Sequence, residues 1–398
     1  MEPSTHARPQ HGEQPQPPWP AAPRPRRRTG LLVAVVALTS SLAGGAIGGM
    51  LVRTYGQSQE PIPARPFATQ VVATGGRTPA ARAEAIARAM LPAVVQVEAQ
   101  DGTVRQTGSG VLLTPDGYAL TNNHVVSGVR TIGVTLSGGQ VYRARLIGAD
   151  PADDLAVLKI AASGLPVPSF GSAAGLQVGQ PVVAVGNPFG FQGSLTSGIV
   201  SALHRVVSIP GDGAGQPQED LVDAIQTDAA INPGNSGGAL ADGNGDIVGI
   251  TTAIATADKG GSGEQADPNA ANAGVGFAIP IDQALQAARA LIAGRRVPVP
   301  FIGVEAYADL SPDLADQYQL QGRAGALIKD VDPGGPAARA GLTSGDLVTR
   351  VGTMDVRGSD SLKVAVRETR VDQPVDLTVV RLGRRLTVRI TPIDGSAG

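Results

Sequence analysis

The sequence predicts a mainly β protein that contains β-barrels. From residue 93 to about 280, twelve short runs rich in valine and isoleucine are separated by glycine, proline and aspartate. No helical periodicity separates these runs, which favours antiparallel strands closed into barrels over a parallel sheet covered by helices. Turn residues at 115–117 (Pro-Asp-Gly) and 137–139 (Ser-Gly-Gly) indicate hairpins between successive strands.

Composition restricts the possible functions further. The chain has 398 residues, enough for two domains of ~100–200 residues with additional segments. The net charge of -2 provides no basic excess to displace counterions from phosphates, so no nucleic-acid partner is expected. Cysteine is absent, and two of the four histidines lie before residue 12. These counts exclude disulfides and cysteine ligands and argue against a multi-histidine metal site. No feature of the sequence implies a metal or an organic cofactor.

The N-terminal segment predicts a membrane anchor. Residues 1–30 are rich in proline and arginine and predict a disordered cytoplasmic tail. Residues 31–52 carry no charge and are long enough for a transmembrane helix, which needs ~20 residues. Four arginines precede this run and only Arg53 follows closely, so the positive-inside rule predicts a single pass with everything after residue 53 outside. A cleaved signal peptide is the competing interpretation, because Ser-Leu-Ala at 41–43 resembles a cleavage site.

The rest of the chain divides at proline-rich segments. A helix is predicted at 79–90, where a threonine can cap it and a proline suits the first helical position. Apolar residues at helical spacing predict another helix at about 281–294, and a further helix is expected near 360–369. The expected organisation is therefore a linker at 53–77, one domain at 78–297 and a second at 298–395.

Three residues have the chemistry of nucleophilic catalysis. Ser236 lies in Gly-Asn-Ser-Gly-Gly, whose glycines allow a sharp turn and a close approach of a carbonyl oxygen to backbone N–H groups. His124 lies in a strand predicted over 118–126, and Asp154 opens the buried run 154–159. Each signal alone is weak, since glycine-rich turns and turn-forming aspartates are common. Together, the order His, Asp, Ser is that of the double-barrel serine proteases.

Several strings also carry a resemblance to a known family. They are T-N-N-H-V-V (121–126), D-L-A-V-L-K (154–159), G-N-P-F-G (186–190), S-G-I-V-S-A-L (197–203), Q-T-D-A-A-I-N-P-G-N-S-G-G-A-L (226–240) and G-V-G-F-A-I-P (274–280). The chain from about 80 to 395 thereby resembles the HtrA (DegP/DegS-type) serine proteases, and its anchor resembles the membrane-anchored members with a single PDZ domain. The resemblance implies a trypsin-like double six-stranded β-barrel followed by an α+β PDZ domain.

The resemblance also implies roles for the site residues. His124 is implied as the general base, Asp154 as the group that orients it, and Ser236 as the nucleophile. The backbone N–H groups of Gly234 and Ser236 are implied as the oxyanion hole. A substrate pocket suited to small or medium aliphatic side chains, together with the strand that pairs with substrate backbone, is implied at Ala230, Ile231, Thr251, Thr252 and Ala253.

The second domain and two loops complete the expectation. Ile302, Gly303 and Val304 resemble the PDZ loop that binds a chain's C-terminal carboxylate. Residues 205–219 and 256–273 are polar and rich in glycine or proline, which predicts mobile loops. His204, beside the first loop, is expected to be a surface residue.

The predicted function follows from this resemblance. It is an ATP-independent serine endopeptidase outside the cytoplasmic membrane, acting in protein quality control and stress response on misfolded or regulatory proteins. C-terminal peptides at the PDZ domain would regulate it, and the family is usually trimeric. Another interpretation is a chaperone or PDZ scaffold with minor proteolysis. A third is an adaptor that only senses peptides.

Overall fold

The computed structural model describes residues 79–102, 104–187, 193–209, 219–252, 274–307, 310–320 and 323–397. The chain divides into two compact units, 1–75 and 76–398, and all described residues belong to the second. The predicted tail (1–30), transmembrane helix (31–52) and linker (53–77) therefore lie outside the described residues. Within the described ranges, no helix has the length and apolar character needed to cross a membrane.

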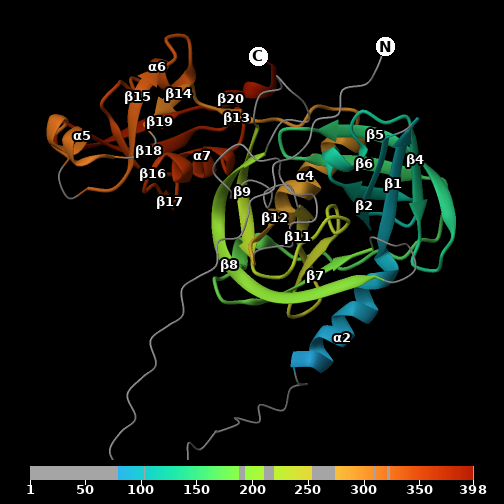
Figure 1. The fold of residues 1–398 in the computed structure, drawn as a ribbon. Coiled ribbons are helices and arrows are strands. Elements are labelled where there is room, and N and C mark those ends of the chain that lie inside the picture. Colours follow the sequence, from blue (N-terminus) through green and yellow to red (C-terminus); the bar gives the residue numbers. More distant parts are fainter. Residues whose placement is uncertain are drawn as a thin grey trace, which may run out of the picture. The chain divides into compact units, whose positions relative to one another are not determined.

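The first barrel is built from six antiparallel strands (Figure 1). They are β1 (Val94–Asp101), β2 (Val104–Leu112), β3 (Tyr118–Thr121), β4 (Thr131–Thr135), β5 (Val141–Asp150) and β6 (Leu155–Ile160). The sheet closes in the order β1-β2-β3-β6-β5-β4, with β4 pairing back onto β1. Aliphatic side chains such as Val97, Leu112 and Leu158 fill its interior. Gly117 has φ +104, a left-handed value suited to glycine, which confirms the hairpin turn predicted at 115–117.

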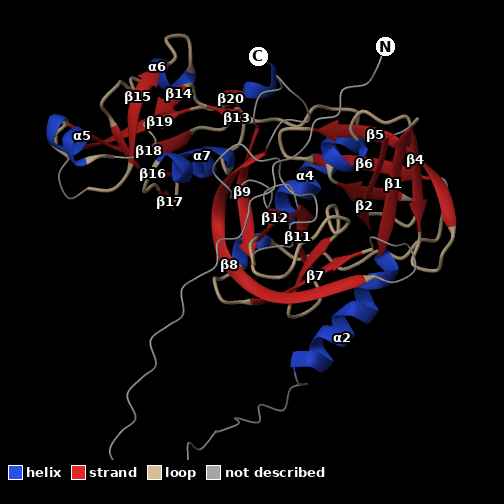
Figure 2. Cartoon of the chain, in the orientation of Figure 1, coloured by secondary structure: helices blue, strands red, loops and turns tan. Residues whose placement is uncertain are grey.

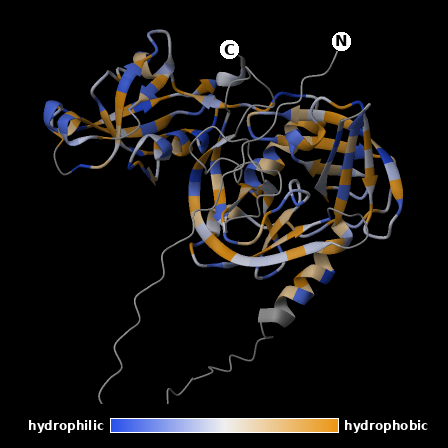
Figure 3. Cartoon of the chain, viewed as in Figure 1, coloured by the Kyte–Doolittle hydropathy of each residue, from blue (hydrophilic) through white to orange (hydrophobic). Residues whose placement is uncertain are grey.

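The second barrel repeats this architecture. Its strands are β7 (Pro181–Gly186), β8 (Ser194–Ile209), β9 (Glu219–Thr227), β10 (Ala239–Asp242), β11 (Ile247–Thr252) and β12 (Gly276–Pro280). They close in the order β10-β11-β12-β9-β8-β7. Figure 3 colours the long β8 ribbon in mixed hydrophobic and polar segments, and its Val200 is fully buried in the core of the second barrel. The predicted double six-stranded barrel is thus confirmed.

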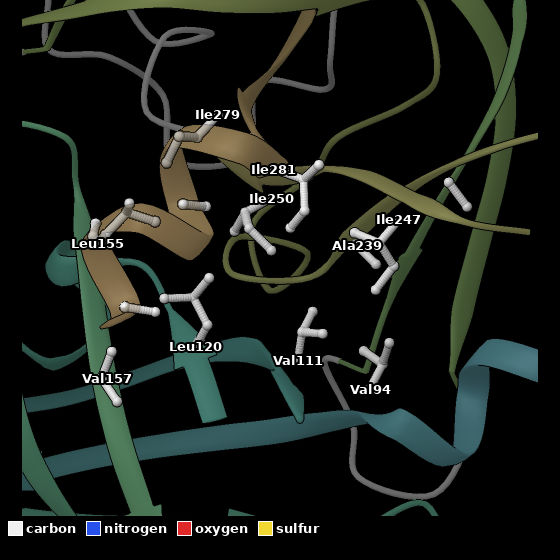
Figure 4. Close-up of a cluster of buried hydrophobic side chains, with 14 of the residues drawn as sticks. Val94, Val111, Leu120, Leu155, Val157, Ala239, Ile247, Ile250, Ile279 and Ile281 are labelled. Atoms are coloured by element: carbon white, nitrogen blue, oxygen red, sulfur yellow. The ribbon is translucent and has the colours of Figure 1, made fainter. Parts of the chain in front are cut away.

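A shared hydrophobic core joins the two barrels. Leu120 and Leu155 from the first barrel and Ile250 and Ile279 from the second belong to one buried cluster (Figure 4). Two helices, α2 (Pro79–Met90) and α4 (Ile281–Ile292), contribute further apolar side chains to it. Because core packing of this kind tolerates little displacement, residues from the two barrels can be held at fixed distances from one another.

The C-terminal region forms an α+β domain, as predicted (Figure 2). Its main sheet has the order β14-β15-β16-β18-β19, with β17 paired to β16, and a separate pair joins β13 to β20. The strands are β13 (Pro300–Phe301), β14 (Val304–Ala306), β15 (Ala326–Val331), β16 (Leu347–Val351), β17 (Met354–Asp355), β18 (Val375–Arg381), β19 (Arg384–Ile390) and β20 (Ile393–Asp394). The helices are α5 (Pro312–Gln317), α6 (Pro336–Arg339) and α7 (Ser359–Arg367).

Two local expectations were wrong. Residues 205–209 of the loop predicted at 205–219 are instead the end of β8, and Glu219 begins β9, while residues 210–218 lie outside the described residues. Pairs such as Val207 with Leu221 extend this hairpin, and the ladder hydrogen bonds outweigh the polar composition that suggested a loop. The strand predicted over 118–126 ends at Thr121, and a short helix, α3 (Asn123–Val126), follows it. The second expected loop, 256–273, lies outside the described residues.

Candidate active site

His124 and Asp154 lie in direct contact. His124 sits in α3, immediately after β3, while Asp154 directly precedes β6, and these two strands pair in the first barrel. Both carboxylate oxygens of Asp154 approach the Nδ1 atom of His124, at 3.0 and 2.9 Å. The His124 backbone N–H also donates to Asp154 Oδ1 at 3.0 Å. The carboxylate thus fixes the imidazole orientation and requires its proton to lie on Nδ1, which leaves Nε2 as the accepting nitrogen.

Asp154 is held in place from several sides. Its side chain is only 4% exposed, and the Thr252 hydroxyl donates to its Oδ2 at 3.1 Å. Its φ of +51 is uncommon for a residue other than glycine. The Asn122 Nδ2 group (2.8 Å) and the Asn123 N–H (3.1 Å) both donate to its backbone carbonyl and stabilise this conformation.

Sequence reasoning missed Asn122 and the side-chain role of Thr252. Asn122 is fully buried, and the signal for it in the sequence is its position two residues before His124 in the T-N-N-H string. Thr252 was predicted as part of a substrate-pairing strand, whereas its buried side chain binds Asp154. Their partners are 32 and 98 residues away in the chain, too far for a local pattern to identify them.

Ser236 follows a tight turn at 232–235. The Asn235 N–H donates to the Asn232 carbonyl at 2.9 Å, and Gly234 has φ +95 after Pro233. Proline at the second position and a glycine with positive φ at the third are typical of a type II turn. The Thr251 hydroxyl donates to the Asn235 carbonyl at 2.6 Å and ties this loop to β11.

The Ser236 loop lies close to the segment that carries His124. A Cβ atom built on Gly108 of β2 would lie 2.7 Å from the Val125 side chain and 3.1 Å from the Ser236 carbonyl. One built on Gly237 would lie 2.5 Å from the Thr121 hydroxyl and would also collide with the Ser109 carbonyl. Glycines are needed here because the second-barrel loop and the first-barrel segment contact each other directly.

The predicted pocket residues occupy different environments. Ile231 is buried in the hydrophobic core of the second barrel, and Ala230 is partly buried, with its carbonyl accepting from the Thr196 hydroxyl at 2.9 Å. The backbone of Thr251 pairs with the nucleophile loop, since Gly237 N–H donates to its carbonyl and its own N–H donates to Gly238. Ala253 lies outside the described residues. The pocket assignment therefore stays a prediction.

The predicted PDZ loop borders a groove. Ile302, Gly303 and Val304 help to line a cavity of about 450 Å³, together with apolar residues of α7 that include Leu362 and Val366. Gly303 has φ +75, and a Cβ there would lie 3.2 Å from atoms of Asp332 and Gly335. Since β14 is the edge strand of its sheet, this groove offers unpaired backbone groups to an added strand.

A histidine outside the proposed catalytic residues also pairs with a carboxylate. His204 is exposed, as expected of a surface residue, and its Nδ1 lies 2.6 Å from Asp223 Oδ1. The hydrogen bond to Asp223 raises the pKa of His204. Among the described residues, no group of three His, Cys, Asp or Glu side chains is arranged to hold a metal ion.

Asp150 should make stability depend on pH. Burial, and next the nearby Asp153 carboxylate, raise its pKa to about 7 from an ordinary value of 3.8. The folded protein therefore retains a proton that the unfolded chain releases, so this group lowers stability as pH rises from about 4 to 7. Asp150→Asn should melt a few degrees higher than wild type at pH 8 and at nearly the same temperature at pH 4. Thermal melts across this range test it, with the exposed Asp116→Asn as control, and a constant difference between Asp150→Asn and wild type would contradict it.

Comparisons with known proteins agree with this geometry. Residues 108–250 match the model of the trypsin-like peptidase domain, and residues 300–391 match that of the PDZ domain. The chain is 38% identical to the serine protease PepD of Mycobacterium tuberculosis over 377 residues, which covers 91% of this chain and 77% of that protein. The solved structure of the HtrA-type protease AlgW with a decapeptide matches 78% of this chain and 98% of its own, with 33% identity and a TM-score of 0.58. The chain belongs to the HtrA-type serine protease family.

Other HtrA-type relatives support the same assignment. A probable periplasmic DegP-like serine endoprotease of Halomonas elongata is 40% identical over 287 residues. The chain spans 72% of its own length in that match and 56% of the relative's length. The family resemblance inferred from the sequence strings is thereby confirmed, and this protein is a serine endopeptidase with a single PDZ domain.

Proposed function

We propose that His124, Asp154 and Ser236 form the catalytic triad of this HtrA-type protease. The observation that carries the proposal is the contact of His124 Nδ1 with both oxygens of the buried Asp154 carboxylate. Nε2 of His124 would accept the Ser236 hydroxyl proton as Oγ attacks a peptide carbonyl. Asp154 would stabilise the resulting imidazolium, which then protonates the leaving amine.

The oxyanion hole is proposed at the backbone N–H groups of Gly234 and Ser236. The negative charge on the tetrahedral intermediate would be bound by these two donors, each worth ~3–4 kcal/mol in transition-state stabilisation. Among the hydrogen bonds of the described residues, none uses the Gly234 N–H, which supports its availability to substrate. Ala230, Ile231, Thr251, Thr252 and Ala253 are proposed to form the pocket and the strand that meet small or medium aliphatic substrate residues.

The biological setting proposed is outside the cytoplasmic membrane. The uncharged run at 31–52 would anchor the chain by a single pass with its N-terminus inside. Relatives named as periplasmic proteases support an extracytoplasmic location. Substrates would be misfolded or regulatory proteins, cleaved without ATP by a homotrimer in quality control and stress response.

This function is tested by incubating the purified full chain with a chemically unfolded protein, without nucleotide and with a metal chelator. We expect defined peptide fragments whose appearance requires no added cofactor. A chaperone or scaffold would keep the unfolded protein soluble and uncut. An adaptor would bind peptides without cleaving the protein, so either outcome would contradict the protease proposal.

Peptide binding at the PDZ groove is proposed to regulate this protease. A peptide with an apolar C-terminal residue and a free carboxylate should bind at Ile302, Gly303 and Val304, because backbone N–H groups there can donate hydrogen bonds to the carboxylate oxygens. Amidation of that C-terminus should weaken binding about tenfold or more, since hydrogen bonds to charged groups contribute ~1.5–3 kcal/mol. Fluorescence anisotropy with labelled peptides measures this difference, and equal affinities would argue against carboxylate recognition.

A further inference from the structure

Ser109 connects the parts of the site from a fully buried position. It lies in β2, has no solvent exposure, and is absent from the family strings identified in the sequence. Its hydroxyl donates to the Gly234 carbonyl at 2.7 Å and accepts from the Asn187 N–H at 2.8 Å. Both capacities of the hydroxyl are therefore used inside the protein, where no water can replace a lost partner.

The backbone of Ser109 makes two more contacts with the site. Its N–H donates to the Ser236 carbonyl at 2.7 Å, and its carbonyl accepts from the Thr121 hydroxyl at 2.7 Å. Thr121 ends the strand that precedes the His124 helix. Ser109 thus bonds to the nucleophile loop, to the histidine segment and to the segment after β7.

The bond to Gly234 has a specific mechanical consequence. Gly234 is the residue most able to rotate in the nucleophile loop, because glycine allows many backbone conformations. Its carbonyl is held by Ser109, while the next two carbonyls, of Asn235 and Ser236, are held by Thr251 and by the Ser109 N–H. The hydrogen bond fixes the peptide plane between Gly234 and Asn235 and holds the Gly234 Cα in place, so the turn that presents the Gly234 and Ser236 N–H groups is restrained from the first barrel.

We propose that Ser109 is a positioning residue that holds the oxyanion-binding loop in the conformation that accepts a developing negative charge. The inference rests on the proposed oxyanion hole at Gly234 and Ser236. The Ser109 side chain acts through Gly234 and has no part in bond making or breaking. A displacement of ~1 Å in a transition-state donor can lower the rate ~100-fold, so a remote hydroxyl can control kcat.

The test compares Ser109→Ala with wild type in the full-length protein, using a fluorogenic peptide and active-site titration. We expect kcat to fall about 10- to 100-fold with KM changed less than about twofold, because only transition-state binding is lost. A peptide boronic acid, whose tetrahedral adduct places an oxygen in the oxyanion hole, should lose affinity by a similar factor. Ser172→Ala, which removes an exposed hydroxyl bonded to Asp282, should leave all three values unchanged.

A structural role alone would give a different result. The proposal would be overturned if active-site titration of Ser109→Ala counted fewer active sites, each with a normal kcat. An unchanged affinity for the peptide boronic acid would also overturn it. If Ser109→Ala does not fold, Ser109→Cys is used instead, because it retains most of the side-chain volume with a weaker hydrogen-bond donor. A lower kcat per active site in this variant supports the proposal, and an unchanged kcat per active site contradicts it. Cleavage that persists in Ser236→Ala would instead refute the proposed triad, so the two failures are distinguishable.

Discussion

Replacement of Ser236 by alanine is expected to lower kcat about 10⁶-fold, because a serine nucleophile and its histidine base act as a unit and the loss of either removes most of the catalysis. The side chain is small and nearly buried, so the fold should be retained and substrate should still bind. Cleavage of a fluorogenic peptide measures kcat, and circular dichroism with thermal melting verifies folding.

Ser172→Ala is the matched control for this experiment. It removes one hydroxyl in the same domain, on a residue that contacts Asp282 away from the triad, and should cleave like wild type. If Ser236→Ala retained more than about one per cent of wild-type kcat, a different group would have to be the nucleophile.

Replacement of Asp154 by asparagine is expected to lower kcat about 10⁴-fold while KM changes little. The asparagine amide can donate toward His124 Nδ1 and favour the imidazole tautomer that carries its proton on Nε2. That nitrogen could then no longer accept the Ser236 proton, and the positive charge on the imidazole would lose its carboxylate partner.

Kinetics on the same fluorogenic peptide test this expectation. Asp116→Asn is the control, because Asp116 is an exposed carboxylate whose ion pair with Lys159 lies in the same barrel. It should leave kcat unchanged. A loss in Asp154→Asn that appeared only in KM would indicate substrate binding and contradict the role in base orientation.

The strands and turns could be predicted because their signals are local. The apolar runs at β1, β6 and β11 and the glycine of the 115–117 turn follow rules that operate within a few residues. The helix predicted at 79–90 coincides with α2 (Pro79–Met90) for the same reason. The extension of β8 to Ile209 could not be seen, because pairing with β9 rather than composition keeps those residues extended.

The sequence predicted less of the candidate active site than of the fold. His124, Asp154 and Ser236 could be proposed as a triad from residue types and order, but the contacts that support them depend on barrel packing. Ser109 meets Gly234 across 125 positions of sequence, and Thr252 meets Asp154 across 98. Neither residue has a chemistry that distinguishes it from other serines and threonines until the two barrels are assembled.

The most direct test of the account is covalent labelling with a fluorophosphonate, followed by mass spectrometry of the digested protein. The hydroxyl activated by His124 should attack phosphorus, so the label should be found on the peptide that contains Ser236, at a rate strongly reduced in Asp154→Asn and absent after unfolding. A protein that cleaves its peptide substrate while Ser236 remains unlabelled, or while another serine carries the label, would contradict the proposed triad.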